Sequence, residues 1–451
     1  MSDFRTVLFL QGPPGYFFRT VADEVEAQGH RALRINFGPA DWFFWHDARC
    51  TQYRGRLKDW PVFLERFVRE NAVTDILYYQ DRLPYHAAAR DLSQRMNVQA
   101  IACEFGYLRP DWITLERGGM SALSHFPEDP ASIIEAARNL PPIDRRPLYN
   151  HPFHLEAFYE VVFNLINVFF WFLFPFFSQD KYYHPIPEYL WMIPRLFLSR
   201  HRNRHANYLI DDVVDAGLPY FVFPLQLQSD YQLRYNAPFD HLLEAAEVAM
   251  TSFARHAPRQ ARLVFKVHPL DQGIEPWRSR LRALARKYGL KRRVYVIDGG
   301  NLDTLLRNAA GMLTVNSTTA LHAARVGCPT KVLGIAVYDI EGIASQRPLD
   351  EFWRAPPKPD PDLVIALERL MATGIQVKGN FYVREGQRVA AREIVSRIIG
   401  DRVNCPQVLR GLQPRVAKAR AHGLPVDFDE ILASGQRTNR WYHAAGDRFS
   451  R

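Results

Sequence analysis

The residues best suited to bind a phosphate follow a short apolar run. Residues 263–267 are mostly apolar and partly β-branched, which predicts a buried strand, and Pro269 ends it because proline lacks the N–H group that a strand ladder needs. Lys266 and His268 then lie at the carboxyl end of this strand. Ligands of open parallel α/β sheets bind outside that edge, so a Lys-x-His-Pro sequence is well placed to contact a phosphate. The alternative is that His268 is a turn residue before proline.

The next part of the chain repeats this pattern of strand, polar edge and helix. Strands are predicted at 294–297, 311–315 and 330–333, and their carboxyl ends should line up along one rim. Hydroxyl groups and free N–H groups at the start of a helix form an anion site, although plain N-capping explains the same hydroxyls. We therefore predict a phosphate site built from Lys266, His268, Pro269, Gly299, Asn316, Ser317 and Thr318.

Two carboxylates also follow predicted strands. Asp230 comes after the apolar run 221–225 and would share the rim of His268 if the strands are parallel. A carboxylate that faces an anomeric carbon serves as the nucleophile of a retaining transfer or the base of an inverting one. Glu104 follows a predicted strand at 98–103, where it can act as a base or bind a hydroxyl. Helix capping for Asp230 and a solvated loop for Glu104 are the alternatives, and three acids compete for the role of Asp230: Asp240, Asp271 and Asp298.

The amino-terminal part predicts an α/β domain over residues 1–149. Strands are expected at 6–10, 32–37, 75–79 and 98–103, with helices at 17–29 and 85–96 between them. The turn between the first strand and helix lacks Cβ atoms at two positions, so an anion can approach its backbone. It matches neither a Walker loop nor GxGxxG, which argues against ATP and NAD. We expect this turn to bind the acceptor through Gly12, Pro13, Pro14 and Gly15.

Residues 150–205 interrupt the α/β pattern. The stretch 161–177 carries no charge and is crowded with phenylalanine, but it is shorter than the ~20 residues of a membrane span and contains Pro175. A basic cluster follows, and aromatic residues beside basic ones are typical of a surface that rests on anionic lipid. The alternative is a buried helix pair between domains. The basic residues are Arg195, Arg200, His201, Arg202 and Arg204.

Composition limits the partners and the chemistry. The 451 residues carry a net charge of +9, which favours anionic lipid, a nucleotide or nucleic acid, but no nucleic-acid-binding motif is present. The four cysteines have no CxxC spacing, and no compact acidic cluster predicts a metal, so we expect no cofactor. The absence of a secretory signal predicts a cytoplasmic protein. A second α/β domain is expected at 206–375, and helices that return to the first domain are expected at 376–451. The polar tail beyond residue 402 is expected to be peripheral or partly disordered.

Several dispersed blocks, in order between residues 6 and 382, resemble the KpsS/LipB family of capsule polysaccharide proteins. The resemblance implies a GT-B-like fold, in which two Rossmann-like domains face a central cleft. It also implies transfer of β-Kdo from CMP-Kdo to phosphatidylglycerol, the first step of a capsule linker. The blocks are Gln11-Gly12-Pro13-Pro14-Gly15, Arg34-Ile35-Asn36-Phe37, Tyr53-Arg54-Gly55, Glu104-Phe105-Gly106-Tyr107-Leu108-Arg109-Pro110-Asp111-Trp112, Lys266-Val267-His268-Pro269-Leu270-Asp271 and Val315-Asn316-Ser317-Thr318.

The resemblance also implies roles for single residues. His268 would hold the CMP phosphate with Ser317 and Thr318 beside it, and Asp230 would form a glycosyl adduct, consistent with retention. The family often has two acids before the glycine that follows Glu104, whereas this chain has Cys103 in the first position and Phe105 in between, so the base role of Glu104 departs from the pattern.

The expected surroundings follow from the same resemblance. The partners would be a CMP-sugar, an anionic phospholipid and other capsule assembly proteins. The protein would be peripheral on the cytoplasmic face of the inner membrane of a Gram-negative bacterium. Two alternatives stay open: a non-catalytic export component that binds the glycolipid, and a sialyltransferase-like enzyme for another CMP-sugar.

Overall fold

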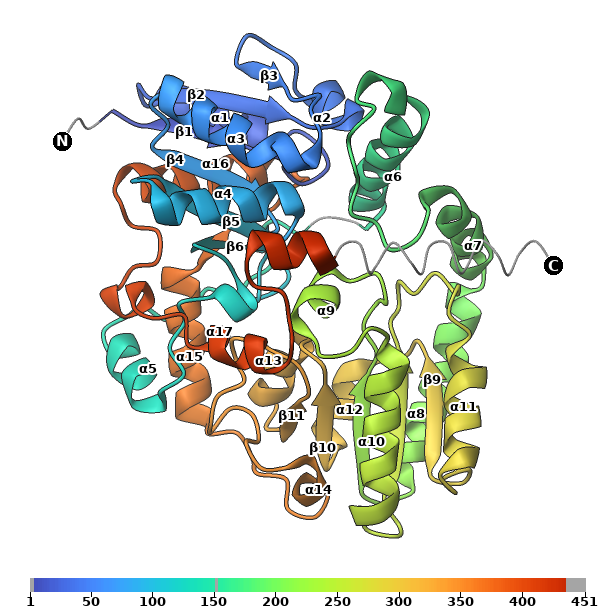
Figure 1. Ribbon diagram of the computed structural model, residues 1–451. Helices are drawn as coiled ribbons and strands as arrows, with labels where there is room; N and C mark the ends of the chain where they lie inside the picture. Colours follow the sequence, from blue (N-terminus) through green and yellow to red (C-terminus); the bar gives the residue numbers. More distant parts are fainter. Residues whose placement is uncertain (1–3, 151–152, 435–451) are drawn as a thin grey trace.

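Two α/β halves make up the computed structural model, which describes residues 4–150 and 153–434 (Figure 1). The first half is built on a sheet of order β12-β6-β5-β4-β1-β2-β3. Its first five strands are parallel, whereas β6 runs antiparallel to both β5 and β12. The strands are β1 (Thr6–Phe9), β2 (Arg31–Asn36), β3 (Cys50–Gln52), β4 (Asp75–Tyr79), β5 (Gln99–Phe105), β6 (Trp112–Arg117) and β12 (Gln376–Lys378).

Helices cover both faces of this first sheet. Because successive side chains of a strand point to opposite faces, Val7 and Phe9 lie in one core while Leu8 and Leu10 lie in the other. The face of Val7 is covered by α1 (Phe17–Ala27) and α16 (Arg384–Ile399). The opposite face is covered by α3 (Trp60–Glu70) and α4 (Pro84–Arg95). The short elements of this half are α2 (Pro39–Phe44), η1 (Leu57–Asp59) and η2 (Ser121–Leu123).

The second half has an entirely parallel sheet of order β11-β10-β7-β8-β9. All its carboxyl ends therefore meet at one edge, as the sequence predicted. The strands are β7 (Tyr220–Pro224), β8 (Arg262–Val267), β9 (Val294–Asp298), β10 (Gly311–Thr314) and β11 (Thr330–Val332). The helices are α9 (Tyr231–Asn236), α10 (Leu242–His256), α11 (Trp277–Lys287), α12 (Leu302–Asn308), α13 (Thr319–Arg325), α14 (Leu349–Phe352) and α15 (Pro361–Gly374).

The GT-B-like fold class is confirmed by these two halves and by the path of the chain between them. After α15 the chain returns to the first half, where β12 joins the sheet and α16 packs beside α1. The helix α5 (Pro130–Ala137) crosses in the other direction, because Ile133 and Ala137 lie in the core of the second half. The short helix α9 lies between the two sheets (Figure 1).

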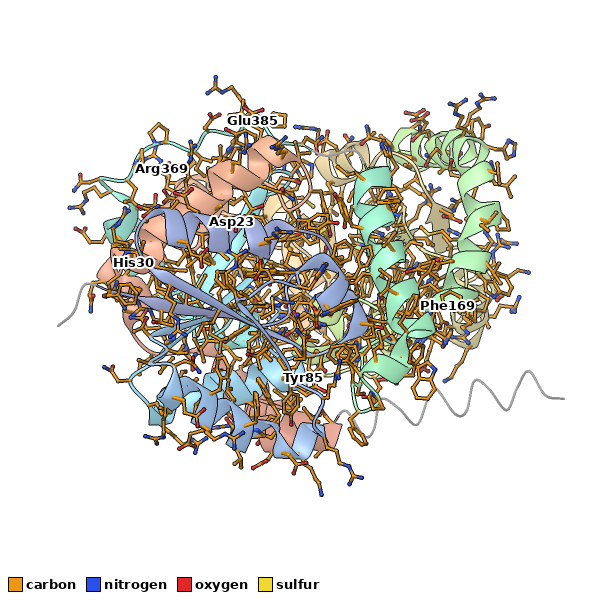
Figure 2. All side chains as sticks on the ribbon, turned by 90° about the horizontal axis from the view of Figure 1, so that it is seen from above. Asp23, His30, Tyr85, Phe169, Arg369 and Glu385 are labelled. Atoms are coloured by element: carbon orange, nitrogen blue, oxygen red, sulfur yellow. The ribbon has the colours of Figure 1, made fainter. Side chains whose placement is uncertain are left out.

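The interrupting segment forms α6 (Phe153–Phe169), η3 (Trp171–Leu173), α7 (Pro185–Phe197) and α8 (Ser199–Asp215). Residue 205 falls inside α8, which packs onto the core of the second half through Ala206, Ile210 and Val213. None of the helices within residues 4–150 and 153–434 is long and apolar enough to cross a membrane. Figure 2 shows Phe169, at the end of α6, on the side of the molecule away from Asp23 and His30.

The expectation of a peripheral tail beyond residue 402 is wrong for residues 403–434. This segment contains η4 (Gln407–Arg410) and α17 (Arg415–Ala421), and it buries Val403, Leu409 and Ile431. A backbone carbonyl of this segment binds to the first half: the buried guanidinium of Arg82 donates to Pro425 O at 2.7 Å. The polar, Arg-rich composition of this segment did not predict its burial. An arginine side chain can bury its aliphatic part while its N–H groups donate to backbone carbonyls. Residues 435–451 lie outside the described part of the chain.

Candidate active site between the two halves

Lys266 brings a buried cation to the site from strand β8. Its side chain is 3% exposed and makes no hydrogen bond or ion pair with any residue that the structure describes. Burial lowers the pKa of Lys266 to about 8, while the charge of Asp298 opposes the shift. A desolvated ammonium that no hydrogen bond or ion pair engages can bind an anion, so Lys266 is suited to bind a phosphate.

His268 follows directly after β8 and is both a turn residue and a possible ligand. Its Nδ1 accepts a hydrogen bond from the N–H of Leu270 at 3.2 Å, and its carbonyl accepts from the N–H of Asp271 at 3.0 Å. Burial, together with the charges of Lys266 and Arg109, lowers the pKa of His268 to about 4. The ring is therefore neutral near pH 7, and because Nδ1 accepts, the proton sits on Nε2, which can donate to a phosphate oxygen.

Asp230 is the N-cap of α9. Its Oδ1 accepts a hydrogen bond from the backbone N–H of Gln232 at 2.8 Å, so the predicted alternative of helix capping is present. Burial raises the pKa of Asp230, while the backbone of Gln232 and the charge of Arg109 oppose the shift. Capping holds the carboxylate at a fixed point and does not exclude its use as a nucleophile.

Glu104 lies close to Asp230, although it comes from the other half. It is near the end of β5, and its Oε2 accepts a hydrogen bond from Gln232 Nε2 at 2.5 Å. Burial and the nearby charge of Asp230 raise the pKa of Glu104 to about 8. The two acids predicted from separate strands thus flank one residue, Gln232, which sequence reasoning did not identify.

The helix α9 that carries Asp230 is held by buried polar groups from both halves. Asn316 donates through Nδ2 to Gln232 O at 2.8 Å, and its Oδ1 accepts from Gln226 Nε2 at 2.8 Å. From the first half, Ser121 Oγ donates to Gln232 Oε1 at 2.6 Å. Asn316, which was predicted to bind the donor, is thus engaged with the protein and positions α9.

The remaining predicted phosphate ligands differ in their surroundings. Ser317 Oγ bonds to Thr319, whereas the hydroxyl of Thr318 does not cap α13 and has no hydrogen-bond partner among the described residues. Gly299 has a packing role, because a Cβ at this position would lie 2.4 Å from Oδ1 of Asn203 in α8. Thr318 therefore keeps a hydroxyl that could bind a phosphate. Gly299 instead allows helix α8 to pack closely against the backbone. Pro269 is exposed after the end of β8.

The acids that competed with Asp230 are placed elsewhere or already paired. Asp271 is buried and accepts hydrogen bonds from Trp277 Nε1 and from the N–H of Gly273, both at 2.9 Å. Asp298 is paired with Arg195 and Arg202 at 3.0 and 2.9 Å. Asp240 is exposed at the surface before α10. Asp230 is the one of the four acids whose charge acts on Glu104.

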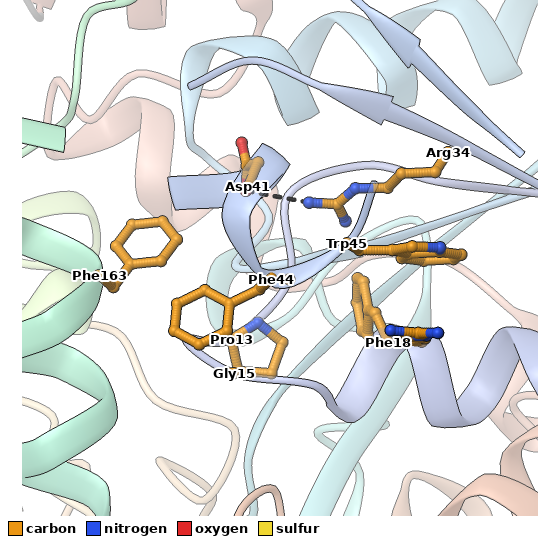
Figure 3. Close-up of a pocket in the computed structure, with 10 residues that line it drawn as sticks. Pro13, Gly15, Phe18, Arg34, Asp41, Phe44, Trp45 and Phe163 are labelled. Atoms are coloured by element: carbon orange, nitrogen blue, oxygen red, sulfur yellow. Dashed lines mark hydrogen bonds and ion pairs between the residues drawn. The ribbon is translucent and has the colours of Figure 1, made fainter. Parts of the chain in front are cut away.

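The turn at 12–15 lines a small cavity (Figure 3). The cavity of about 20 Å³ has room for a single water. Arg34 and Asp41, whose side chains form a buried ion pair of 2.9 Å, lie on one side of it, and Phe44 and Phe163 on the other. Gly15 has φ +119° and faces Tyr159 of α6. The helix α6 thus packs against the turn through Tyr159, and binding of an acceptor by Gly12, Pro13, Pro14 and Gly15 stays a prediction.

Arg109 is a site residue to which the sequence assigned no role. It follows β5, and its guanidinium lies 4.8 Å from the ring centroid of Phe105. Its positive charge acts on Asp230, Glu104 and His268. Its position could have identified it from the sequence, because Arg109 comes a few residues after the end of the strand that carries Glu104. Across the described ranges, no group of three or more histidine, cysteine or acidic side chains is arranged to hold a metal, and a metal-free site stays a prediction.

Comparison with known proteins gives the family. A model described as capsule polysaccharide biosynthesis protein matches residues 74–382. The capsule polysaccharide modification protein LipB of Neisseria meningitidis serogroup B is 32% identical over 399 residues, which cover 85% of this chain and 93% of LipB. The capsule polysaccharide export protein KpsS of Escherichia coli is 29% identical over 391 residues, which cover 84% and 97%.

Among solved structures, KpsC of Thermosulfurimonas dismutans, a beta Kdo 2,7 transferase, aligns with 87% of this chain and 98% of its own. The TM-score is 0.40 and the identity 12%, so the assignment rests on the sequence relatives and the family model. The two relatives cover most of the chain, and the range of the family model includes Glu104, Asp230 and His268. The chain therefore belongs to the KpsS/LipB family of capsule polysaccharide proteins.

Proposed function

We propose that this protein is a glycosyltransferase that transfers β-Kdo from CMP-Kdo to phosphatidylglycerol, with retention of configuration and without a metal cofactor. The observation that carries the proposal is the meeting of Glu104 and Asp230, one from each half, on either side of Gln232. A protein that only binds a glycolipid has no need for two desolvated acids beside an unpaired lysine and a neutral histidine.

The first step uses the second half of the molecule. The Asp230 carboxylate forms a bond to the anomeric carbon while the bond between that carbon and the CMP phosphate oxygen breaks. CMP leaves with the bonding electrons. Lys266 and the Nε2–H group of His268 stabilise the charge that develops on the phosphate, a contribution that fixed donors make most strongly in a desolvated site. Thr318 is expected to add a hydroxyl donor.

The second step uses Glu104. Once Asp230 is esterified it carries no charge, so the repulsion that helps raise the pKa of Glu104 disappears. Glu104 then ionises more readily and can take the proton of the acceptor hydroxyl as that oxygen attacks the anomeric carbon. The Asp230 carboxylate is released, and two displacements give net retention.

We further propose that the protein works on the cytoplasmic face of the inner membrane, beside other capsule assembly proteins. An apolar surface on the outer side of the insertion supports contact with lipid, because large rings are seldom left in water without a partner. We call it the aromatic surface, and its exposed fractions are 61% for Phe169, 48% for Phe170, 62% for Trp171 and 59% for Phe172. Trp42 and Phe43 of α2, which contacts α6, are 42% and 48% exposed.

The decisive experiment is incubation of the purified protein with CMP-Kdo and a fluorescent phosphatidylglycerol, followed by mass spectrometry. We expect a lipid product one Kdo heavier, and a Kdo adduct on a peptide that contains Asp230 when the acceptor is omitted. Asp230→Ala should abolish the product but leave CMP binding intact, with Asp240→Ala as the matched control. Binding of a Kdo-bearing glycolipid without turnover would favour the export component, and turnover of CMP-sialate alone would favour the sialyltransferase-like alternative.

A further inference from the structure

We propose that Arg109 binds the carboxylate that the donor sugar carries at its anomeric carbon, and that it thereby restricts the enzyme to CMP-linked sugar acids. The inference rests on the proposed function and adds to it the group that recognises the sugar itself.

The guanidinium of Arg109 is exposed and has no hydrogen bond or ion pair with any residue in the described ranges. It is nevertheless not a loose surface group, because it lies 4.8 Å from the centroid of the Phe105 ring, a contact that restricts where a planar cation can point. Other arginines near the site are occupied: Arg195 and Arg202 both pair with Asp298. Arg109 is thus held in position by Phe105, and its N–H groups remain available to a ligand.

The ionisable groups near Arg109 indicate which anion of the substrate it would bind. Its charge lowers the pKa of Asp230 and Glu104 against the effect of burial, and it also lowers the pKa of His268, so it acts on acids from both halves and on the phosphate ligand. An anomeric carbon that bears a carboxylate brings a further negative charge toward Asp230. Two like charges repel strongly in a desolvated site unless a cation lies beside them.

Lys266 and His268 do not supply that cation. Both come from the end of β8, where they are assigned to the phosphate, and His268 is neutral because its pKa is about 4. Arg109 comes from the other half, on the chain segment that also carries Glu104. A guanidinium presents parallel N–H groups that match the two oxygens of a carboxylate, which a lysine ammonium does not. The sugar carboxylate is therefore the anion that fits this position.

The test compares donor and nucleotide in two variants, Arg109→Met and Arg109→Lys. We expect Arg109→Met to reduce kcat/KM for CMP-Kdo about 100-fold, as when one partner of a charge pair that binding covers from water is removed, while the inhibition constant of CMP stays within about twofold. Arg109→Lys should restore little, because it keeps the charge but not the fork. Arg138→Met, which removes an exposed arginine beside Glu135, is the control and should change neither value.

Each other outcome decides the matter. Equal losses for CMP-Kdo and CMP would place Arg109 on the phosphate, full rescue by lysine would leave only a general charge effect, and no loss would remove Arg109 from the site; all three overturn the inference. Unchanged melting temperatures establish that the variants are folded. A wild-type protein that binds CMP but does not transfer Kdo would contradict the proposed function instead. In that case, equal affinity of the wild type for CMP-Kdo and CMP would overturn the inference, whereas tighter CMP-Kdo binding that Arg109→Met abolishes would support it.

Discussion

Lys266 and Glu104, one from each half, both titrate about a unit above neutral pH. Desolvation lowers the pKa of Lys266 to about 8, and desolvation with the charge of Asp230 raises the pKa of Glu104 to about 8. Above that pH Lys266 loses the charge that would hold a phosphate, and below it Glu104 loses the carboxylate that would accept a proton. Desolvation thus shifts the two pKa values in opposite directions, downward for Lys266 and upward for Glu104.

We therefore expect kcat/KM for CMP-Kdo to fall above about pH 8 as Lys266 deprotonates, because this ratio reports the ionisations of the free enzyme up to the release of CMP. Glu104 acts in the second step, so its ionisation should appear in kcat, which should rise with pH. Its pKa there should lie below that of the free enzyme, because the charge of Asp230 is lost. Lys266→Met should remove the alkaline fall of kcat/KM, and Glu104→Gln the acid limb of kcat, from whatever activity remains. A kcat/KM that is flat between pH 7 and 9 in the wild type would contradict the role of Lys266, and a kcat without an acid limb would contradict that of Glu104.

His268 is expected to act as a neutral donor. His268→Ala should slow transfer about 100-fold, equivalent to about 3 kcal/mol, since it removes one fixed donor to the leaving phosphate. Because its pKa is about 4, the loss should be constant between pH 6 and 8. Single-turnover rates measure it, and His268→Gln, which keeps an N–H group, is the matched variant. Normal turnover by a folded His268→Ala protein would show that His268 is only a turn residue.

At the scale of elements, the insertion has two different faces. On the inner face of α6, Phe163 and Asn167 are buried, and Asn167 Oδ1 accepts from the N–H of Ala40 at 2.9 Å. The outer face continues into the aromatic surface. The predicted buried contact is thus present on the inner side of α6, whereas contact of the outer side with lipid stays a prediction.

The basic cluster divides in the same way. Arg195 and Arg202 are held by Asp298, whereas Arg200 and Arg204 are exposed. The expectation that all these arginines meet lipid is therefore corrected for the first two, since a carboxylate near the end of β9 already pairs with them. Sequence could not distinguish them, because Asp298 is far away along the chain.

We expect Arg200→Ala with Arg204→Ala to weaken binding to vesicles that contain phosphatidylglycerol by about 2 kcal/mol, at about 1 kcal/mol for each charge. Co-sedimentation at low and high salt measures this, and the effect should vanish on neutral vesicles. Arg195→Ala with Arg202→Ala, the matched pair, should leave vesicle binding unchanged and instead lower the melting temperature. Equal effects of the two pairs on vesicle binding would refute the division.

At the scale of the whole molecule, Arg82 ties the two halves together. It follows β4 of the first half and is fully buried. Its Nη1 donates to Tyr235 O at 2.8 Å and to Pro425 O at 2.7 Å, and its Nη2 donates to Asn236 Oδ1 at 3.1 Å. One side chain thus joins the first half, helix α9 and the carboxyl-terminal segment.

We expect Arg82→Met to lower the free energy of unfolding by about 3 kcal/mol, because it removes a buried guanidinium that donates to three oxygens, two of them in α9. It should also reduce kcat, since α9 carries Asp230. Urea denaturation and steady-state kinetics measure the two effects. Arg66→Met, on an exposed helix face, should change stability by less than about 0.5 kcal/mol. A stable but slow Arg82→Met protein would separate the placement of α9 from the stability of the fold.

Most of the strands, the edge at which they end and most of the residues at that edge could be predicted from the sequence. Alternation of apolar residues and a proline stop are local signals, so the positions of His268, Lys266, Glu104 and Asp230 followed from neighbours within a few residues. The strands β3, β6 and β12 were not predicted. The strands β3 and β12 are each three residues long, and β12 pairs with a strand far away along the chain.

Which of these residues lie together depends on contacts between distant segments of the chain. Glu104 and Asp230 are brought together by α9, a six-residue helix that hydrogen bonds from both halves hold in place, and no periodicity encodes contacts between distant segments. The same holds for the pairing of Arg195 with Asp298 and for the burial of residues 403–434. Local pattern specifies what each segment is, whereas long-range hydrogen bonds and ion pairs specify what it faces. The free guanidinium of Arg109 became visible only when its surroundings were known.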